Sequence, residues 1–385
     1  MSLISGQPGY SLKNPVVLFV LTLGLMVRML MAGLGQNFDM DSYLIVTDVL
    51  HHGGNVYAET TRYNYGPVWF QCLHFFDWLS GHDPKIFRYA VAGFLSLVDA
   101  GIFFVLLKTF GRLVAGLFFL NPIAVLITGF QSQFDNFAIL LALAAMLLIG
   151  DDFEKPISRR KLWGLLLLGL SLATKHLFFA FPFWLAIKQK GMLQKFLVGL
   201  IPVAVFLAGF APYWSVGKTG IVQNVFHYHS TTRDFFYHWA VPKLVQFVFS
   251  SQTVWLLLLG FFAFVCRRKS VVESLLLYTA ALVAFCPAFA NQYFAIPVAF
   301  LALRFNWLAL AYTIAITLFL LVNENGLQLH LLHRVPQDIY GYMAVFSLGF
   351  CLVWSLWQTQ ILRLLRICLD EIRLQLGLAA TINKP

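Results

Sequence analysis

The sequence is poor in charged residues, and this scarcity excludes a soluble protein. Asp, Glu, Lys and Arg together make up 11% of the 385 residues, whereas 59% are hydrophobic. A soluble domain carries roughly 25% charged residues. Mean hydropathy is +0.76, and apolar runs approaching the ~20 residues of a membrane-crossing helix recur along the chain. The composition therefore predicts an all-α polytopic membrane protein.

Cysteine is also scarce, and its placement argues against a disulfide framework. The five cysteines are scattered, most of them in or beside apolar stretches, with no spacing that suggests a disulfide or a metal site. We expect them to be buried thiols. The chain also lacks a Gly-rich phosphate-binding motif. Its net charge of +10 does not indicate nucleic-acid binding, because membrane proteins concentrate Lys and Arg in their cytoplasmic loops.

Hydropathy predicts about 12 transmembrane helices, within a range of about 10–13. The run that begins at Pro15 is long and is preceded by a single positive charge, so we expect a retained span rather than a cleaved signal peptide. Residues 36–88 are polar and aromatic, and we expect them to form a long first extracytoplasmic loop with one or two interfacial helices. The predicted spans are 15–34, 89–107, 113–130, 134–150, 162–174, 176–188, 196–213, 243–265, 271–289, 292–304, 306–322 and 339–358.

Positive charges set the predicted orientation. With the N-terminus inside, eighteen of the 27 Lys and Arg residues fall in inner segments. This bias predicts that both termini are cytoplasmic. The stretch Gln358–Leu376 carries arginines on an apolar background, so we expect an amphipathic helix on the cytoplasmic leaflet. Residues 1–385 are treated as one membrane-embedded domain.

The acidic pair Asp39 and Asp41 is the most informative feature of the sequence. It follows the first apolar run directly, at its predicted outer end. Ionised groups beside the hydrocarbon region are costly and are usually kept there for function, although an arbitrary loop carboxylate is more often simply solvated. Because the pair abuts the membrane and opens a loop of unusual length, we expect it to be functional.

Further polar clusters fall on the same predicted side of the membrane. Taken singly, each has an ordinary explanation: a helix cap, a turn anchored at the headgroups, or an interfacial aromatic. Their convergence on one face favours a single extracytoplasmic cavity. The clusters are Arg62 and Tyr65 in TRYNYGPVW; Gln133, Asp135 and Asn136 in QSQFDNF; Lys175 and His176; His229, Arg233, Asp234 and His238 in the loop 214–242; and Asn291, Gln292 and Tyr293.

The order of these segments resembles the GT-C superfamily of membrane glycosyltransferases. The shared order is an acidic pair after the first span, then YNYGPVW, QSQFDNF, the loop HYHSTTRDFFYH and finally NQYF. The likeness is greatest to the first mannosyltransferases of GPI-anchor synthesis and their bacterial relatives. It runs from about residue 15 to residue 304.

The resemblance implies a GT-C-like enzyme that moves a hexose, with mannose favoured, from a polyprenyl- or dolichyl-phosphate donor to an acceptor hydroxyl with inversion. Asp41 would be the general base and Asp39 its support, and two close carboxylates would raise one another's pKa. The donor phosphate would be bound by Arg233, His229, Lys175 and His176. The sugar or acceptor would be bound by Gln133, Asp135, Asn136, Arg62, Tyr65, Asp234, His238, Asn291, Gln292 and Tyr293.

The expected partners follow from the same resemblance. They are the bilayer, a lipid-linked sugar donor, and a glycolipid, polysaccharide or protein acceptor on the periplasmic side of a bacterial inner membrane or the lumenal side of the ER. A small membrane partner subunit is compatible with it. A nucleotide-sugar donor is disfavoured by the missing Gly-rich domain. The resemblance fixes no cofactor, and the Asp-x-Asp spacing also admits a divalent metal.

Two other function classes remain open at the level of sequence. The main alternative is a secondary transporter or flippase for a sugar or lipid-linked sugar. Transporter sites tend to lie near the bilayer midplane within repeated halves, and no convincing repeat relates residues 1–190 to 191–385. A non-enzymatic subunit that scaffolds another membrane enzyme is the third hypothesis.

Overall fold

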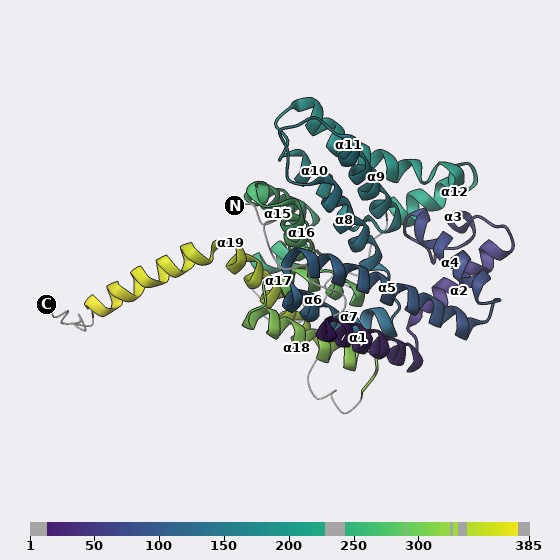
Figure 1. The fold of residues 1–385 in the computed structure, drawn as a ribbon, viewed down its shortest axis with the longest axis horizontal. Helices are drawn as coiled ribbons and strands as arrows, with labels where there is room; N and C mark the ends of the chain where they lie inside the picture. Colours follow the sequence, from purple (N-terminus) through teal and green to yellow (C-terminus); the bar gives the residue numbers. More distant parts are fainter. Residues whose placement is uncertain (1–13, 228–242, 289, 324–325, 330–336, 376–385) are drawn as a thin grey trace.

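The chain is built from helices. The computed structural model describes residues 14–227, 243–288, 290–323, 326–329 and 337–375. Within these ranges the chain forms α-helices and short 3₁₀ and π segments, with no β-strand (Figure 1). The predicted all-α class is confirmed.

Four helical segments of the described chain are long and apolar enough to cross a membrane, and a bent pair raises the number to five. This confirms a membrane protein, whereas the expected twelve spans are not confirmed. The four are α1 (Pro15–Gly33), α5 (Pro84–Phe110), the run Met192–Phe226 and Ile339–Leu369 within α19 (Gln337–Gln375). Shorter apolar helices are α8 (Asp135–Ile149), α16 (Val271–Phe285), the stretch Asn291–Leu303 and α18 (Trp307–Val322).

Several predicted spans are broken, and local sequence explains the breaks. The predicted span 113–130 divides into α6 (Arg112–Phe119) and the stretch Pro122–Phe130, with a bend of 47° between them. Pro122 opens the second part because proline is accepted at a helix start but not in its interior. The second part contains α7 (Pro122–Val125) and the π-helix η1 (Leu126–Phe130). The predicted span 243–265 is likewise divided, into α14 (Lys243–Ser250) and α15 (Gln252–Val265).

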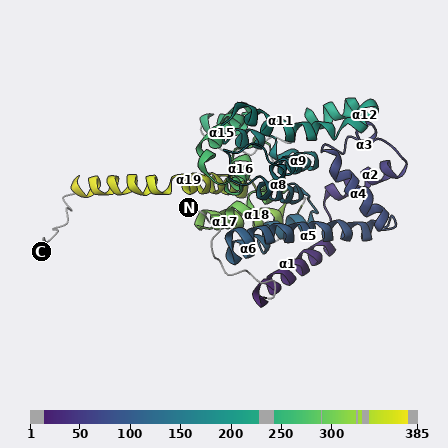
Figure 2. The ribbon, with the colours of Figure 1, turned by 45° about the horizontal axis from the view of Figure 1, so that its top comes forward.

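Residues 36–88 form a helical layer that holds more helix than the one or two interfacial helices expected there. They contain α2 (Phe38–His51), α3 (Val56–Glu59) and α4 (Pro67–Leu79). Aromatic and aliphatic side chains from these helices and the start of α5 make a second apolar core, separate from the main one. Trp69 stacks on Phe134 with ring centres 4.3 Å apart, which ties the layer to the α8 side of the main body. The layer lies opposite the end from which α19 projects (Figures 1 and 2).

Helix α8 runs antiparallel to α9 (Arg159–Thr174), and charged side chains lie at both ends of this helix pair. At one end, the side chain of Lys175 meets that of Asp135. At the other, Arg160 donates to the backbone of Leu147. A helix of about 15 residues spans roughly 22 Å, so these two ends are well separated.

The remaining short elements complete the described body. The predicted span 176–188 is a 3₁₀ turn, η2 (His176–Phe178), followed by α10 (Phe181–Ala186). Helix continues from α11 (Met192–Ala208) through η3 (Ala211–Tyr213) and α12 (Trp214–Gly220) to η4 (Ile221–Phe226). The start of the expected loop 214–242 is therefore helical. The last part of the described body holds η5 (Cys266–Arg268), η6 (Asn291–Ala295) and α17 (Val298–Leu303).

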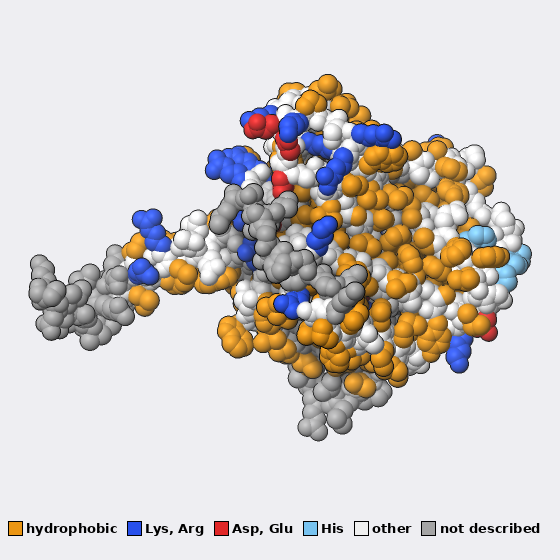
Figure 3. Space-filling model, viewed as in Figure 1, with side chains coloured by type: hydrophobic (Ala, Val, Ile, Leu, Met, Phe, Trp, Pro, Cys, Tyr) orange, Lys and Arg blue, Asp and Glu red, His pale blue; other side chains and the backbone are white. Residues whose placement is uncertain are grey.

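α19 is longer than the predicted span 339–358. Its backbone leaves helical geometry at Trp357 (φ −125°, ψ 18°), and a second helical part follows. The described part of the predicted amphipathic stretch, as far as Gln375, is therefore helical, and it extends away from the body (Figure 1). Figure 3 shows Lys and Arg mainly along α19 and over the adjoining part of the body near α10 and α11, whereas histidines appear at the opposite edge.

Candidate functional site

The two acidic residues open a helix, and this geometry separates them. Asp39 and Asp41 both lie in the first turn of α2, where negative charge is stabilised by the helix dipole. Residues two apart in a helix are rotated by about 200° about its axis, so they point to different sides. Asp39 is partly buried against the body, whereas Asp41 is exposed and accepts a hydrogen bond from Gln36 at 2.8 Å.

Asp39 is held by donors from two parts of the chain. Its Oδ2 accepts hydrogen bonds from Asn37 Nδ2 at 2.9 Å and from Gln133 Nε2 at 2.6 Å. Burial raises the pKa of Asp39 above its ordinary value, and the charge of Asp135 adds to the rise. Lys175 and the two amide donors act in the opposite direction. Asp39 is thus a carboxyl whose proton affinity is increased, next to a lysine.

Lys175 and Asp135 form a buried ion pair beside Asp39. Lys175 directly follows α9 and has extended backbone geometry (φ −149°, ψ 124°), and its Nζ donates to Oδ2 of Asp135, the first residue of α8, at 2.7 Å. The ammonium also lies 4.7 Å from the ring centre of Phe134 and 5.0 Å from that of Tyr65. Aromatic faces attract a cation, so the rings help to hold Lys175 in place.

The turn before α8 carries backbone strain at this site. Ser132 adopts φ 51°, in the left-handed region that side-chain-bearing residues rarely occupy. Such residues cluster at functional sites, where the surrounding structure holds them. This turn brings Gln133 to Asp39. Gln133 Oε1 and Asp135 Oδ1 are buried here and accept no hydrogen bond from a described protein group, so each is an acceptor that a bound ligand can use.

A cavity of about 580 Å³ lies beside Lys175. Lys175, His176 and Tyr65 contribute to its lining, together with Gln292 and Tyr293 of η6. The rest of its wall is largely apolar and comes from helices that are distant in sequence. These apolar contributors include Phe206, Phe226, Trp255, Leu282 and Ile296. A mixed lining of this kind suits a ligand that has a polar part and a hydrocarbon part.

Five of the sequence-predicted site residues therefore meet at the cavity. Tyr65, Lys175, His176, Gln292 and Tyr293 line it. Lys175 is paired with Asp135, and Asp39, which accepts from Gln133, interacts electrostatically with both members of that pair. Asn291 faces a different neighbour, since its Nδ2 donates to Asn323 at 3.0 Å. His229, Arg233, Asp234 and His238 lie outside the described residues.

Three predicted residues take other positions. Asp41 is exposed, as described above. Arg62 is exposed and its guanidinium lies 4.1 Å from the ring centre of Phe38. Asn136 is buried and donates to Asp99 at 2.6 Å, so its amide is engaged within the helix bundle rather than at the cavity.

Asn136 belongs to a buried polar network that sequence reasoning missed. Arg28 of α1 donates through Nε to Asp99 of α5 at 2.9 Å, with both side chains fully buried. Thr128 donates to the same carboxylate at 2.8 Å. A signal was present in the sequence: Arg28 and Asp99 are the single charged residues in the predicted spans 15–34 and 89–107. Opposite charges isolated in two spans favour a pair, because a lone charge in the membrane is costly.

The expected Asp-x-Asp metal interpretation gains no support from this geometry. Asp39 and Asp41 point to different sides of α2, and among the described residues the potential metal-ligand group is elsewhere, at His51, Asp77 and His82.

No protein-family model, curated protein or solved structure matches the chain.

Proposed function

We propose that the chain is a membrane glycosyltransferase that moves a hexose, with mannose favoured, from a polyprenyl- or dolichyl-phosphate to an acceptor hydroxyl. One observation carries the proposal: Lys175 lines a largely apolar cavity, is paired with the buried carboxylate of Asp135, and interacts electrostatically with the partly buried Asp39. A cation at a lipid-compatible cavity suits the phosphate and the hydrocarbon tail of such a donor. The adjacent carboxylate supplies the base that the acceptor needs.

The proposed step is a single displacement. The acceptor oxygen attacks C1 of the sugar and forms the new glycosidic bond, while the bond from C1 to the phosphate oxygen breaks and its electron pair stays on the phosphate. The acceptor proton passes to a carboxylate. Lys175 and His176 stand where negative charge grows on the leaving phosphate.

Asp39 is a better candidate for the base than Asp41. Burial raises its pKa, so it takes up a proton more readily than an ordinary carboxyl, and it interacts with the charge of Lys175 and accepts from Gln133. Asp41 points to solvent and is bonded to Gln36. The acceptor would approach from the Asp39 side of Lys175, and the donor would occupy the cavity.

Purified protein in detergent, supplied with radiolabelled polyprenyl-phosphate mannose or glucose and extracted lipids as acceptors, tests the proposal. Wild type should transfer label from one of the two donors. Asp39→Asn should lose about 10²–10⁴-fold in rate, the usual contribution of a general base. Asp41→Asn should retain most activity. No transfer by folded wild type with either donor would overturn the proposal, and an active Asp39→Asn would remove Asp39 from the mechanism.

A flippase for a lipid-linked sugar is the second candidate, favoured by the buried Arg28–Asp99 pair. Charged groups inside a membrane bundle often mark a transport pathway, and this pair adjoins the bent α6–α7 segment through Arg28 Nη1, which donates to the backbone of Phe119. In sealed vesicles, a flippase would move the intact sugar lipid between leaflets without acceptor. A transferase would instead cleave it, and only with acceptor present.

A further inference from the structure

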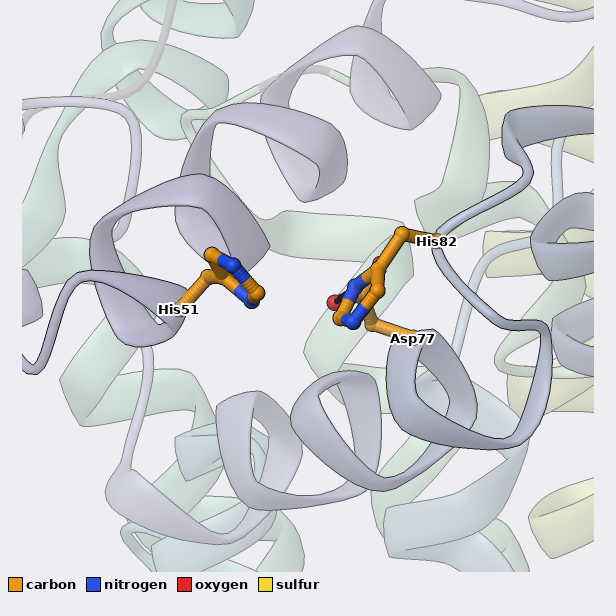
Figure 4. A group of neighbouring side chains, drawn as sticks. All are labelled: His51, Asp77 and His82. Atoms are coloured by element: carbon orange, nitrogen blue, oxygen red, sulfur yellow. Dashed lines mark hydrogen bonds and ion pairs between the residues drawn. The ribbon is translucent and has the colours of Figure 1, made fainter.

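A cluster of metal-ligand side chains lies at the other end of α2 from Asp39. His51 comes from the last turn of α2, Asp77 from the last turn of α4, and His82 from the turn that leads into α5. One ligand atom from each lies within 4.8 Å of the other two. Figure 4 shows the ring of His51 facing His82 and Asp77 across the space between the two segments.

The sequence of the α4–α5 turn holds His82 in this position. Gly81 and His82 both adopt positive φ, 60° and 64°, and His82 is among the residue types that tolerate this region. Asp83 then caps α5 by accepting from the backbone N–H of Lys85 and Ile86. The turn is therefore fixed at both ends. It directs the His82 ring to Asp77, with Nδ1 and Oδ2 separated by 2.6 Å.

The ligand set matches a particular class of ion. Two imidazole nitrogens and one carboxylate oxygen are ligands that Zn²⁺ accepts, and other divalent first-row metals bind similar sets. Asp77 is almost buried, with a side chain 9% exposed, whereas the His82 side chain is 51% exposed. The carboxylate is thus a fixed anchor. The ligand atoms lie within 4.8 Å of one another, so only small movements of the two exposed histidine side chains would bring them to the ~2.0–2.1 Å that zinc–nitrogen bonds need.

We propose that His51, Asp77 and His82 bind one divalent transition-metal ion of the zinc class. The ion would replace the proton between His82 and Asp77, and that proton would be released to solvent on binding. Three protein ligands leave a fourth position for water. The ion would link the C-terminal end of α2 to the α4–α5 turn.

The proposal is independent of the proposed sugar transfer. His51 follows Asp39 by twelve positions on the same helix, which corresponds to roughly 18 Å along the axis. The ion would not touch the cavity or the transferred sugar. It would stabilise the helical layer formed by α2 and α4.

The test is a titration of chelator-treated full-length protein in detergent with Zn²⁺, read by calorimetry and by thermal unfolding. Wild type should bind one ion and unfold at a higher temperature when Zn²⁺ is present, because a ligand of the folded state raises its stability. His51→Ala and His82→Asn should each weaken binding at least ~10-fold, since loss of outer-shell partners alone costs about that much. Asparagine also accepts positive φ, so His82→Asn preserves the turn.

Two neighbouring histidines provide matched controls. His52 and His74 are exposed and lie outside the cluster. His52→Ala and His74→Ala should bind Zn²⁺ as wild type does. Absence of Zn²⁺ binding by folded wild type would overturn the proposal. So would unchanged stoichiometry and affinity in a folded His51→Ala/His82→Asn double variant.

Discussion

Lys175 donates to Asp135 at 2.7 Å while the two side chains are only 5% and 1% exposed. The pair joins the end of α9 to the start of α8 at the point where the cavity begins. Removal of either side chain would destabilise the folded protein, because it would leave the other charge buried without its counter-charge. The same pair therefore supports both the fold and the proposed site.

Lys175→Met should destabilise the protein by about 3–5 kcal/mol, the usual cost of breaking a buried ion pair. The loss arises mainly from Asp135, which is left buried and charged. The double variant Lys175→Met/Asp135→Leu should recover much of the loss, because an apolar pair of similar volume is often tolerated. Denaturant unfolding in detergent measures both.

The exposed pair of Lys190 and Glu154 is the matched control. Its side chains are 72% and 71% exposed at a separation of 2.6 Å. Lys190→Met should cost less than about 1 kcal/mol, as surface pairs do. Equal losses in Lys175→Met and Lys190→Met would show that burial of the Lys175–Asp135 pair does not matter.

Gly66→Ala should destabilise the protein by about 1–3 kcal/mol, in the range of other overpacking substitutions. A Cβ at Gly66 would lie 2.0 Å from the backbone oxygen of Ala173, which cannot rotate away. Gly93→Ala is the control, because a Cβ there meets nothing within 4 Å and Gly93 lies inside α5. It should be neutral or slightly stabilising, since alanine favours helix more than glycine does. Unfolding of the two variants measures the difference.

The Gly66 contact shows which features of the YNYGPVW segment can be predicted from sequence and which cannot. The sequence predicted one or two helices within residues 36–88, and α4, which begins at Pro67 directly after this segment's Gly66, is one of the helices found there. The close packing of Gly66 on Ala173 of α9 could not be predicted, because the local sequence does not indicate which helix lies behind the turn. Tyr63 adds a second hidden contact, since its hydroxyl donates to the backbone of Gly66 at 2.6 Å.

The apolar composition was sufficient for the helical class. Polar positions at predicted span ends indicated Lys175 and Asp135, the 36–88 segment indicated Tyr65, and the structure brings these three side chains together. The roles of Asp39 and Asp41 were harder to predict. The sequence suggested a loop in which the carboxylates act together, whereas a helix starting at Phe38 directs them to different sides. The hydrogen bond of Asn136 was equally hard to predict, because its partner Asp99 lies 37 positions away in the sequence.

Ala290→Trp should abolish sugar transfer without unfolding the protein, if the cavity holds the donor. Ala290 lines the cavity, so an indole there would occupy the space that the donor needs. Ala58→Trp makes the same change at an exposed position of α3 and should leave transfer near the wild-type rate. The radiolabel assay measures transfer, and a melting curve of the same preparation shows whether each variant is folded. Full activity in a folded Ala290→Trp would exclude the cavity as the donor site.

The pH dependence of stability should separate wild type from Asp39→Asn. The pKa of Asp39 is raised by burial, so its protonated form is favoured in the folded state. Its stabilising contribution is therefore complete below its ordinary value of 3.8 and is lost as pH rises through the raised value. Asn mimics the protonated form and does not titrate. The unfolding temperature of wild type relative to Asp39→Asn should fall across this window.

Gln133→Leu should move that window to higher pH. The Gln133 amide donates to Asp39 at 2.6 Å and lowers its pKa, so loss of the donor raises the pKa further. Melting curves from about pH 4 to pH 8, near and above the ordinary carboxyl range, measure both effects. Identical pH profiles for wild type and Asp39→Asn would contradict a raised pKa. A window that moves to lower pH in Gln133→Leu would show that the amide does not act on the ionised carboxylate.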